Sequence, residues 1–302
     1  MAASGATARG AAGGAEFRAR SFSARDGLRL YFRDYGDPLS PGTPVLCLGG
    51  LTRNSKDFHP LAQRLAGRRR VLCPDYRGRG RSPYDPDWRN YAPPRILNDA
   101  IQLLAATNLH RVVVCGVSFG GYLAMAMGVA APSALAGVIL DDVGPEVDPA
   151  VGRQILDYVS VDRPQPDWDT AVAALKARFP NLSRRDQTVW RRFAEGSYRE
   201  AEDGRLHFDW DPAIARPLQR MGTRPADYWP LYRSLTRVPV LAIRGGLSEV
   251  LSPATLARMA AEKPDLVHLT LPDVGHAPML DEPETEKAID DFLARIDARA
   301  DG

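Results

Sequence analysis

The sequence lacks the features of a membrane-bound or nucleic-acid-binding protein. Among its 302 residues, no apolar stretch approaches the ~18 residues that a membrane-spanning helix requires. Its 39 basic and 37 acidic side chains leave a formal charge of +2, so no global field attracts nucleic acid or anionic lipid. A hydrophobic content of 44% with 25% charged residues is typical of a globular domain. We expect neither nucleic acid nor a membrane as a partner, and we leave a homodimer open.

Cysteine is also scarce. Cys47, Cys73 and Cys115 each end a short apolar run, and none belongs to a C-x-x-C pattern, so no metal or redox site is expected from them. Buried free thiols suit a reducing cytoplasm, which is the location we predict. Residues 1–15 are rich in Ala and Gly and lack the apolar region of a secretory signal, which predicts a disordered tail.

Arginine clusters locally, at Arg68-Arg69-Arg70 and in the segment Arg77-Gly78-Arg79-Gly80-Arg81. The aromatic residues that accompany such clusters in nucleic-acid sites are missing here. The segments therefore indicate a solvated face or a turn, not a phosphate-binding patch.

Apolar patterning predicts an α/β fold. Residues 17–23 and 28–35 partly alternate around a turn at Asp26-Gly27, which indicates an antiparallel edge hairpin. From Val45 onward, short unbroken apolar runs alternate with helical segments, as in parallel strands that are buried on both faces. The same rhythm returns from Val238 to Ile296. We predict a mostly parallel sheet of about eight strands, flanked by helices, over residues 16–144 and 237–302.

Between these two parts the strand rhythm stops. Residues 145–236 indicate helix and loop, with many scattered aromatic side chains. Most of these aromatics must pack an insertion, but pockets are also lined by such side chains. We therefore predict a helical cap over an active site. The shape of the pocket depends on how cap aromatics such as Trp168, Trp210 and Trp229 fold over the sheet, which residue spacing does not reveal.

The strongest chemical signal is Gly116-Val117-Ser118-Phe119-Gly120. It follows the apolar run Val112–Cys115 and precedes a helix-forming segment, and this strand–turn–helix context gives a G-x-S-x-G motif its meaning. A tight turn exposes the hydroxyl, and the helix N-terminus favours a developing oxyanion. We predict Ser118 as a nucleophile. No G-x-G-x-x-G pattern supports a dinucleotide here, and we expect no cofactor and no metal.

A serine nucleophile needs a base, and five histidines are available. His276 lies in a Gly- and Pro-containing loop after the last predicted strand, where an imidazole can face the sheet edge. A carboxylate should then orient the imidazole. Two candidates preserve the chain order Ser, acid, His: Glu249 after the strand from Val238, and Asp142 after the preceding strand. We favour Glu249, with Asp142 as the alternative.

Two backbone N–H groups should bind the oxyanion. One belongs to Phe119, the residue after the nucleophile. The other should lie in the loop after the first central strand, where Gly49 and Gly50 allow a substrate to approach the backbone closely, and we choose Leu51.

Together these motifs resemble those of the α/β-hydrolase superfamily, over about residues 17–296. The resemblance rests on four segments in the right order, namely GVSFGG at the nucleophile, GGLTRN at the oxyanion loop, DYRGRGRS from Asp75, and GHAP around His276. It implies the α/β-hydrolase fold, a cap over residues 145–236, and a structural turn at the arginine-rich segment. Two departures are the missing histidine before the oxyanion glycine and a glutamate where relatives carry aspartate.

The chemistry that follows is hydrolysis of a small ester or lactone through an acyl-enzyme, a carboxylic ester hydrolase activity. The same triad could serve carbon–carbon bond hydrolysis of ring-fission products, acyl transfer or cofactor-free perhydrolysis. A non-catalytic small-molecule receptor is the alternative of a different class, and turnover separates it from an enzyme.

Overall fold

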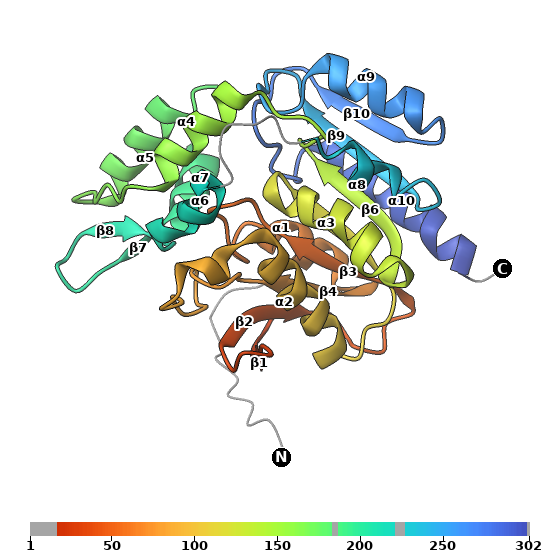
Figure 1. Ribbon diagram of the computed structural model, residues 1–302, viewed down its shortest axis with the longest axis horizontal. Helices are drawn as coiled ribbons and strands as arrows, with labels where there is room; N and C mark the ends of the chain where they lie inside the picture. The colour runs from red at the N-terminus through yellow and green to blue at the C-terminus, as the bar shows by residue number, and fades with distance from the viewer. Residues whose placement is uncertain (1–16, 183–186, 221–226, 301–302) are drawn as a thin grey trace.

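The computed structural model describes residues 17–182, 187–220 and 227–300, and its centre is an eight-stranded sheet (Figure 1). The strand order is β1-β2-β4-β3-β5-β6-β9-β10. The bounds of these strands are β1 Arg18–Ser23, β2 Arg29–Tyr35, β3 Gly42–Leu48, β4 Arg69–Pro74, β5 Val112–Val117, β6 Leu135–Asp141, β9 Val240–Gly245 and β10 Val267–Leu271. The predicted tail, residues 1–15, lies outside the described residues.

The predicted edge hairpin is present. β1 and β2 pair antiparallel with Arg18 opposite Asp34, and Gly27 takes the positive φ of 86° that the connecting turn requires. β2 also pairs antiparallel with β4, whereas every later pairing in the sheet is parallel. The carboxyl ends of β3, β5, β6, β9 and β10 therefore meet at one edge of the sheet.

Helices cover both faces of this sheet. Their bounds are α1 His59–Leu65, α2 Pro93–Ala106, α3 Phe119–Ala130, α8 Trp229–Arg233, α9 Pro253–Glu262 and α10 Pro283–Ala300, with short 3-10 helices at η1 Trp88–Tyr91 and η2 Pro132–Ala134. The cores show which helix covers which face, because α2, α3, α8 and α9 share one buried cluster and α1 and α10 share the other. Strands between two such layers must be apolar on both sides, which explains the unbroken apolar runs.

The three cysteines are free and buried between the sheet and its helices. The prediction that they are buried free thiols is confirmed, while the cytoplasmic location stays a prediction. Within the described residues, no helix combines the length and apolar character needed to cross a membrane.

The segment between β6 and β9 forms a separate group of elements beside the sheet (Figure 1). It contains α4 Pro149–Val159, α5 Trp168–Arg178, α6 Gln187–Ser197, β7 Tyr198–Glu200, β8 Leu206–Phe208, η3 Pro212–Ile214 and α7 Ala215–Arg220. The β7–β8 hairpin was not predicted, because strands of three residues are too short to show alternation. At the far end of the predicted cap range, α8 packs against α3 and belongs to the core cluster of the sheet.

Backbone hydrogen bonds tie this insertion to the core. Gly80 N–H donates to the Asp209 carbonyl at 2.9 Å, and Asp211 N–H donates to the Gly78 carbonyl at 2.8 Å, on either side of a bridge between Arg79 and Trp210. This two-stranded contact joins the turn after β4 to the segment after β8.

The turn after β4 differs from the expected solvated face. Arg77 and Arg79 are fully buried, and of the three arginines in this segment Arg81 is the exposed one. Arg77 is surrounded by carboxylates, with a bidentate contact to Asp99 at 2.7 and 2.8 Å and a second partner in Asp85 at 2.7 Å. Paired charges of this kind are the usual way in which a guanidinium is tolerated in an interior.

Candidate active site

Ser118 lies on a sharp turn between β5 and α3. Its backbone has a positive φ of 51°, a strained conformation for a residue other than glycine. The turn needs glycine on both sides because a methyl group at Gly116 would collide with the Gly120 carbonyl, and one at Gly120 with the Leu48 carbonyl. The G-x-S-x-G spacing thus packs strand, helix and oxyanion loop closely enough to leave the serine hydroxyl at the sheet edge.

His276 meets this hydroxyl. The loop after β10 places His276 Nε2 at 3.0 Å from Ser118 Oγ, within proton-transfer distance. The loop is fixed from the insertion as well, because Gly275 N–H donates to the Asn181 carbonyl at 2.6 Å. The structure therefore brings together the two residues that the sequence analysis paired.

The carboxylate at the imidazole is Asp142, not Glu249. His276 Nδ1 lies 2.7 Å from Asp142 Oδ2, and the other carboxylate oxygen, Oδ1, accepts the Gly245 N–H at 3.0 Å. Asp142 is fully buried, whereas Glu249 is exposed and lines a surface depression with Glu146. Our preference for Glu249 was wrong, and the alternative has the required geometry.

Sheet order explains this outcome. β6 is the direct neighbour of β5, and Asp141 at its end pairs with Val117, so the next residue lies one strand from the nucleophile. β9 lies one strand further away, and Glu249 comes four residues after its end. Asp142 also takes a positive φ of 51°, a region in which aspartate is enriched among non-glycine residues.

The preceding Asp141 is fully buried and has a different environment. Burial and the nearby Asp142 charge raise the pKa of Asp141 well above its usual value. Burial therefore favours the neutral form of the Asp141 carboxyl, and Asp142 is the carboxylate that contacts His276.

The loop after β3 lies on the other side of Ser118. Gly49, Gly50 and Leu51 all line the same cavity as the serine. The arginine-rich turn holds this loop in place, because Tyr76 O–H donates to the Gly49 carbonyl at 3.1 Å and Arg79 Nε to the Leu51 carbonyl at 2.9 Å. Leu51 is thus positioned beside the nucleophile, and its role as an oxyanion donor with Phe119 stays a prediction.

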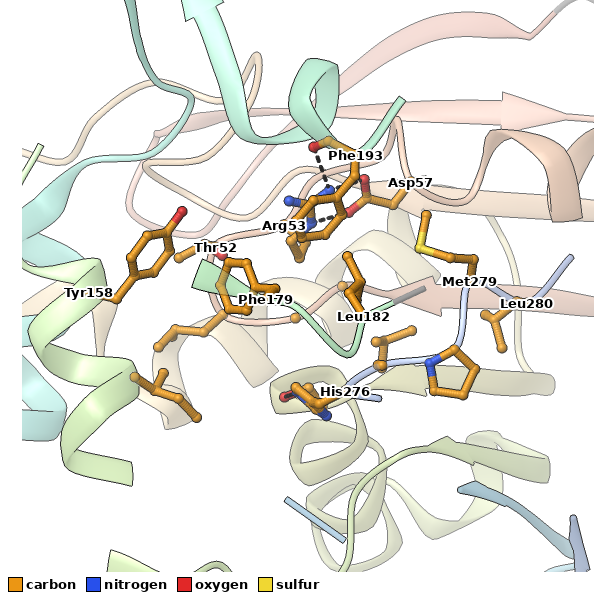
Figure 2. Close-up of a pocket in the computed structure, with 18 of the residues that line it drawn as sticks. Thr52, Arg53, Asp57, Tyr158, Phe179, Leu182, Phe193, His276, Met279 and Leu280 are labelled. Atoms are coloured by element: carbon orange, nitrogen blue, oxygen red, sulfur yellow. Dashed lines mark hydrogen bonds and ion pairs between the residues drawn. The ribbon is translucent and has the colours of Figure 1, made fainter. Parts of the chain in front are cut away.

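These residues open into a cavity of about 150 Å³. Figure 2 shows His276 on one side of it, with apolar and aromatic side chains facing it from the insertion. The wall contributed by the insertion comprises Ile155, Tyr158, Val159, Arg178, Phe179, Leu182 and Phe193. Residues of the insertion thus line the cavity that contains Ser118 and His276, and their action as a cap stays a prediction.

The three tryptophans named above do not line the cavity. Trp210 is buried in the insertion and stacks on Phe208 at a centroid distance of 3.9 Å. Trp229 packs at the sheet, against Tyr232. Trp168 also lies away from the cavity, and its indole N–H donates to Glu200. The sequence contained no signal that separated packing aromatics from lining ones.

Arg53, which lines the cavity, has its charge paired within the protein. Arg53 contacts both carboxylate oxygens of Asp57 at 2.6 Å, and its guanidinium lies 4.1 Å from the centre of the Phe193 ring (Figure 2). A neutralised guanidinium stacked on an aromatic ring mainly holds the insertion to the core.

A parallel sheet with a serine on a strand–helix turn, a histidine after the last strand and a covering insertion defines a hydrolase fold with a complete Ser–His–Asp arrangement. The comparison with protein families agrees, because residues 45–287 match the model of the alpha/beta hydrolase family. The chain belongs to this family and is a hydrolase.

Named relatives cover most of the chain. It is 31% identical over 264 residues to a 3-hydroxybutyrate-oligomer hydrolase from Cupriavidus necator, covering 84% of this chain and 89% of the relative. It is 28% identical to a 2-(acetamidomethylene)succinate hydrolase from Mesorhizobium japonicum, covering 83% and 88%. Among solved structures, an α/β hydrolase from Novosphingobium aromaticivorans aligns with a TM-score of 0.87 and 43% identity, covering 94% of this chain and 100% of that one.

Proposed function

We propose that this chain is a serine hydrolase that cleaves a short carboxylic ester or lactone through an acyl-enzyme. The observation that carries the proposal is the continuous contact from Ser118 Oγ through His276 to Asp142, at 3.0 and 2.7 Å. A serine hydroxyl is a weak nucleophile by itself, and this contact supplies both the base and the group that orients it.

The proposed reaction has two halves. Ser118 Oγ attacks the ester carbonyl carbon while His276 Nε2 takes its proton, and the Leu51 and Phe119 N–H groups bind the oxyanion. The C–O bond then breaks, and the alkoxide takes the proton from His276. A water molecule, deprotonated by the same imidazole, attacks the acyl-enzyme and releases the acid. Asp142 holds the histidine tautomer and stabilises the imidazolium throughout.

The lining of the cavity and the activity named for one relative both support a small hydroxy-acid ester as the substrate. Apart from Arg53, Asp57 and Arg178, the lining is mostly apolar and aromatic, which suits a small carbon skeleton. The Cupriavidus necator relative is named for hydrolysis of 3-hydroxybutyrate oligomers. We propose that esters of short hydroxy acids are substrates here as well, and that residues 145–236 act as the cap that selects them.

The test combines covalent labelling with turnover. The full chain should react with a fluorophosphonate probe and hydrolyse p-nitrophenyl butyrate, and Ser118→Ala should abolish labelling and lower kcat by about 10⁴-fold or more. Ser23→Ala, at an exposed strand end, is the control and should behave as the unaltered protein. Sustained turnover by Ser118→Ala would exclude the mechanism, and labelling without turnover would favour a receptor.

A further inference from the structure

The catalytic cavity is small for an oligomeric ester. Its volume of about 150 Å³ falls below the usual range of ligand pockets, about 300–1,000 Å³. An apolar cavity of that size holds a benzene-sized molecule of about six heavy atoms. This is the size of a four-carbon hydroxyacyl group. The acyl part of an ester can fit next to Ser118, and the leaving part has to extend out of the cavity.

A second cleft adjoins the cavity in the cap. Its volume is about 480 Å³, and it lies between α4, α5 and the β7–β8 hairpin. Tyr158 and Arg178 line both spaces and thus form the wall between them. In Figure 2, Tyr158 stands on α4 at the side of the cavity opposite Met279 and Leu280. A substrate that passes these two side chains enters the second cleft.

Arg178 is the distinctive residue of this wall. Its guanidinium stacks over Tyr158 and Phe179, with distances of 5.5 and 5.1 Å to the ring centres, and donates to the Gln154 carbonyl at 3.3 Å. Among the described residues, no carboxylate lies within ion-pair distance of it. Arg178 is exposed, so its charge faces the solvent of the cleft.

A second guanidinium belongs to Arg163, an exposed residue that also lines the cleft. Arg163 donates to the carbonyls of Tyr158 and Val161 at 2.8 and 3.0 Å, which fixes its position, and no carboxylate of the described part of the chain forms an ion pair with it. Asp157 also lines the cleft, so its lining includes two arginines and one aspartate. Arg53 in the catalytic cavity differs from these two arginines, because its guanidinium is paired with the Asp57 carboxylate at 2.6 Å.

We propose that Arg178 binds a carboxylate on the leaving-group side of the substrate, so that the cap cleft is the subsite for the acid end of a short, linear hydroxy-acid oligomer. This inference rests on the proposed function, and it adds the orientation in which the substrate lies in the site. The acyl unit at the hydroxyl end occupies the cavity beside Ser118, and the next unit, with its free carboxylate, lies against Arg178. Cleavage then releases a hydroxy acid whose new hydroxyl takes the proton from His276.

The experiment compares two substrates that differ in one charge. The linear dimer of 3-hydroxybutyrate carries a free carboxylate, and its terminal primary amide has nearly the same shape without the charge. Because a charge-assisted hydrogen bond is lost with the amide, the unaltered protein should hydrolyse the free acid with a kcat/KM about 10- to 100-fold higher. The difference should appear mainly in KM, because the contact is made equally in substrate and transition state.

Substitution at Arg178 should remove this preference. Arg178→Gln is expected to lower kcat/KM for the free acid by about tenfold or more and to bring the ratio of free acid to amide near one, while Arg178→Lys retains part of it. Arg153→Gln on α4 is the matched control, since Arg153 is exposed and lines neither space, and it should keep the full ratio.

The outcomes separate this inference from the proposed function. Equal hydrolysis of acid and amide by the unaltered protein, or an equal loss of both in Arg178→Gln, would overturn the subsite while Ser118-dependent cleavage of p-nitrophenyl butyrate still stood. Absence of Ser118-dependent cleavage of every ester would instead remove the proposed function, and the subsite with it.

Discussion

The two sides of the catalytic cavity are built in different ways. On the sheet side, Ser118 and Asp142 follow neighbouring parallel strands, and His276 is held from both directions by hydrogen bonds of 3.0 and 2.7 Å. On the cap side, Tyr158 lies on α4 and Phe179 directly follows α5, and both present apolar surface. Polar geometry fixed by a sheet suits bond-making, whereas packed side chains on helices can change without disturbing it. We therefore expect the sheet side to set the rate and the cap side to set the choice of substrate.

The largest effect should come from the buried acid of the sheet side. Asp142→Asn keeps the shape of the side chain but loses the charge that holds the His276 tautomer, so kcat should fall by about 10⁴-fold with little change in KM. Steady-state kinetics with p-nitrophenyl butyrate measures both. Glu249→Gln is the matched control and should retain full activity. A larger loss in Glu249→Gln than in Asp142→Asn would contradict the assignment made from the geometry.

A cap substitution should change selectivity more than rate. Phe179→Ala enlarges the cavity, so the ratio of kcat/KM for p-nitrophenyl octanoate over the butyrate should rise about tenfold or more, since room for even one further methylene is worth about 1–3 kcal/mol in such a pocket. The control is Tyr84→Ala, an exposed aromatic outside the cavity. If Phe179→Ala instead lowered kcat for every chain length alike, the division between rate and selectivity would fail.

The smallest effect concerns the pH dependence of cap stability. His207 on β8 contacts Asp203 at 3.0 Å and Asp162 at 2.6 Å, and these two carboxylates raise the pKa of His207 above its usual 6.5. A raised pKa means that the charged imidazole stabilises the fold fully below about pH 6.5, and that this stabilisation is lost as the pH rises through the folded-state pKa. The site is partly exposed, so the contribution stays below about 1 kcal/mol.

Thermal unfolding of His207→Gln measures this contribution. The substitution should lower Tm by about 2 °C or less at pH 6 and by nothing measurable at pH 9. His110→Gln removes an exposed histidine that lies outside the cap, and it should show no such trend. A deficit for His207→Gln that grows with pH would have the wrong sign and would exclude the ion pair.

Local patterns were enough to predict the sheet and two members of the site. The run before Ser118 and the helix formers after it were enough to predict β5 and α3, because a buried strand and a helix of this length leave distinct periodicities. His276 could be identified because it lies in a loop with glycine and proline after the last strand. In both cases the information is contained in a dozen neighbouring residues.

The acid and the cap wall could not be predicted, since they depend on distant packing. The choice between Asp142 and Glu249 depends on which strand lies beside β5, and sheet order is not written in either loop. The approach of α4 and α5 decides that Tyr158 and Arg178 share a wall, and the buried face of one helix does not reveal the other. Arg79 was misjudged for a similar reason, because burial of a charge depends on the carbonyl of Leu51, which lies 28 residues earlier.

The backbone contact between the turn after β4 and the segment after β8 has a consequence for recombination. In sequence, the cap looks like a removable module inserted between two halves of the core. In space, Gly78 and Gly80 form a two-stranded ladder with Asp209 and Asp211, so the module extends into the first half of the chain. A chimera that exchanges residues 145–236 alone would leave this ladder mismatched. Exchange of residues 145–236 together with residues 77–81 would keep both sides of this ladder from the same parent. A chimera library that exchanges both segments should therefore contain more folded members than one that exchanges residues 145–236 alone.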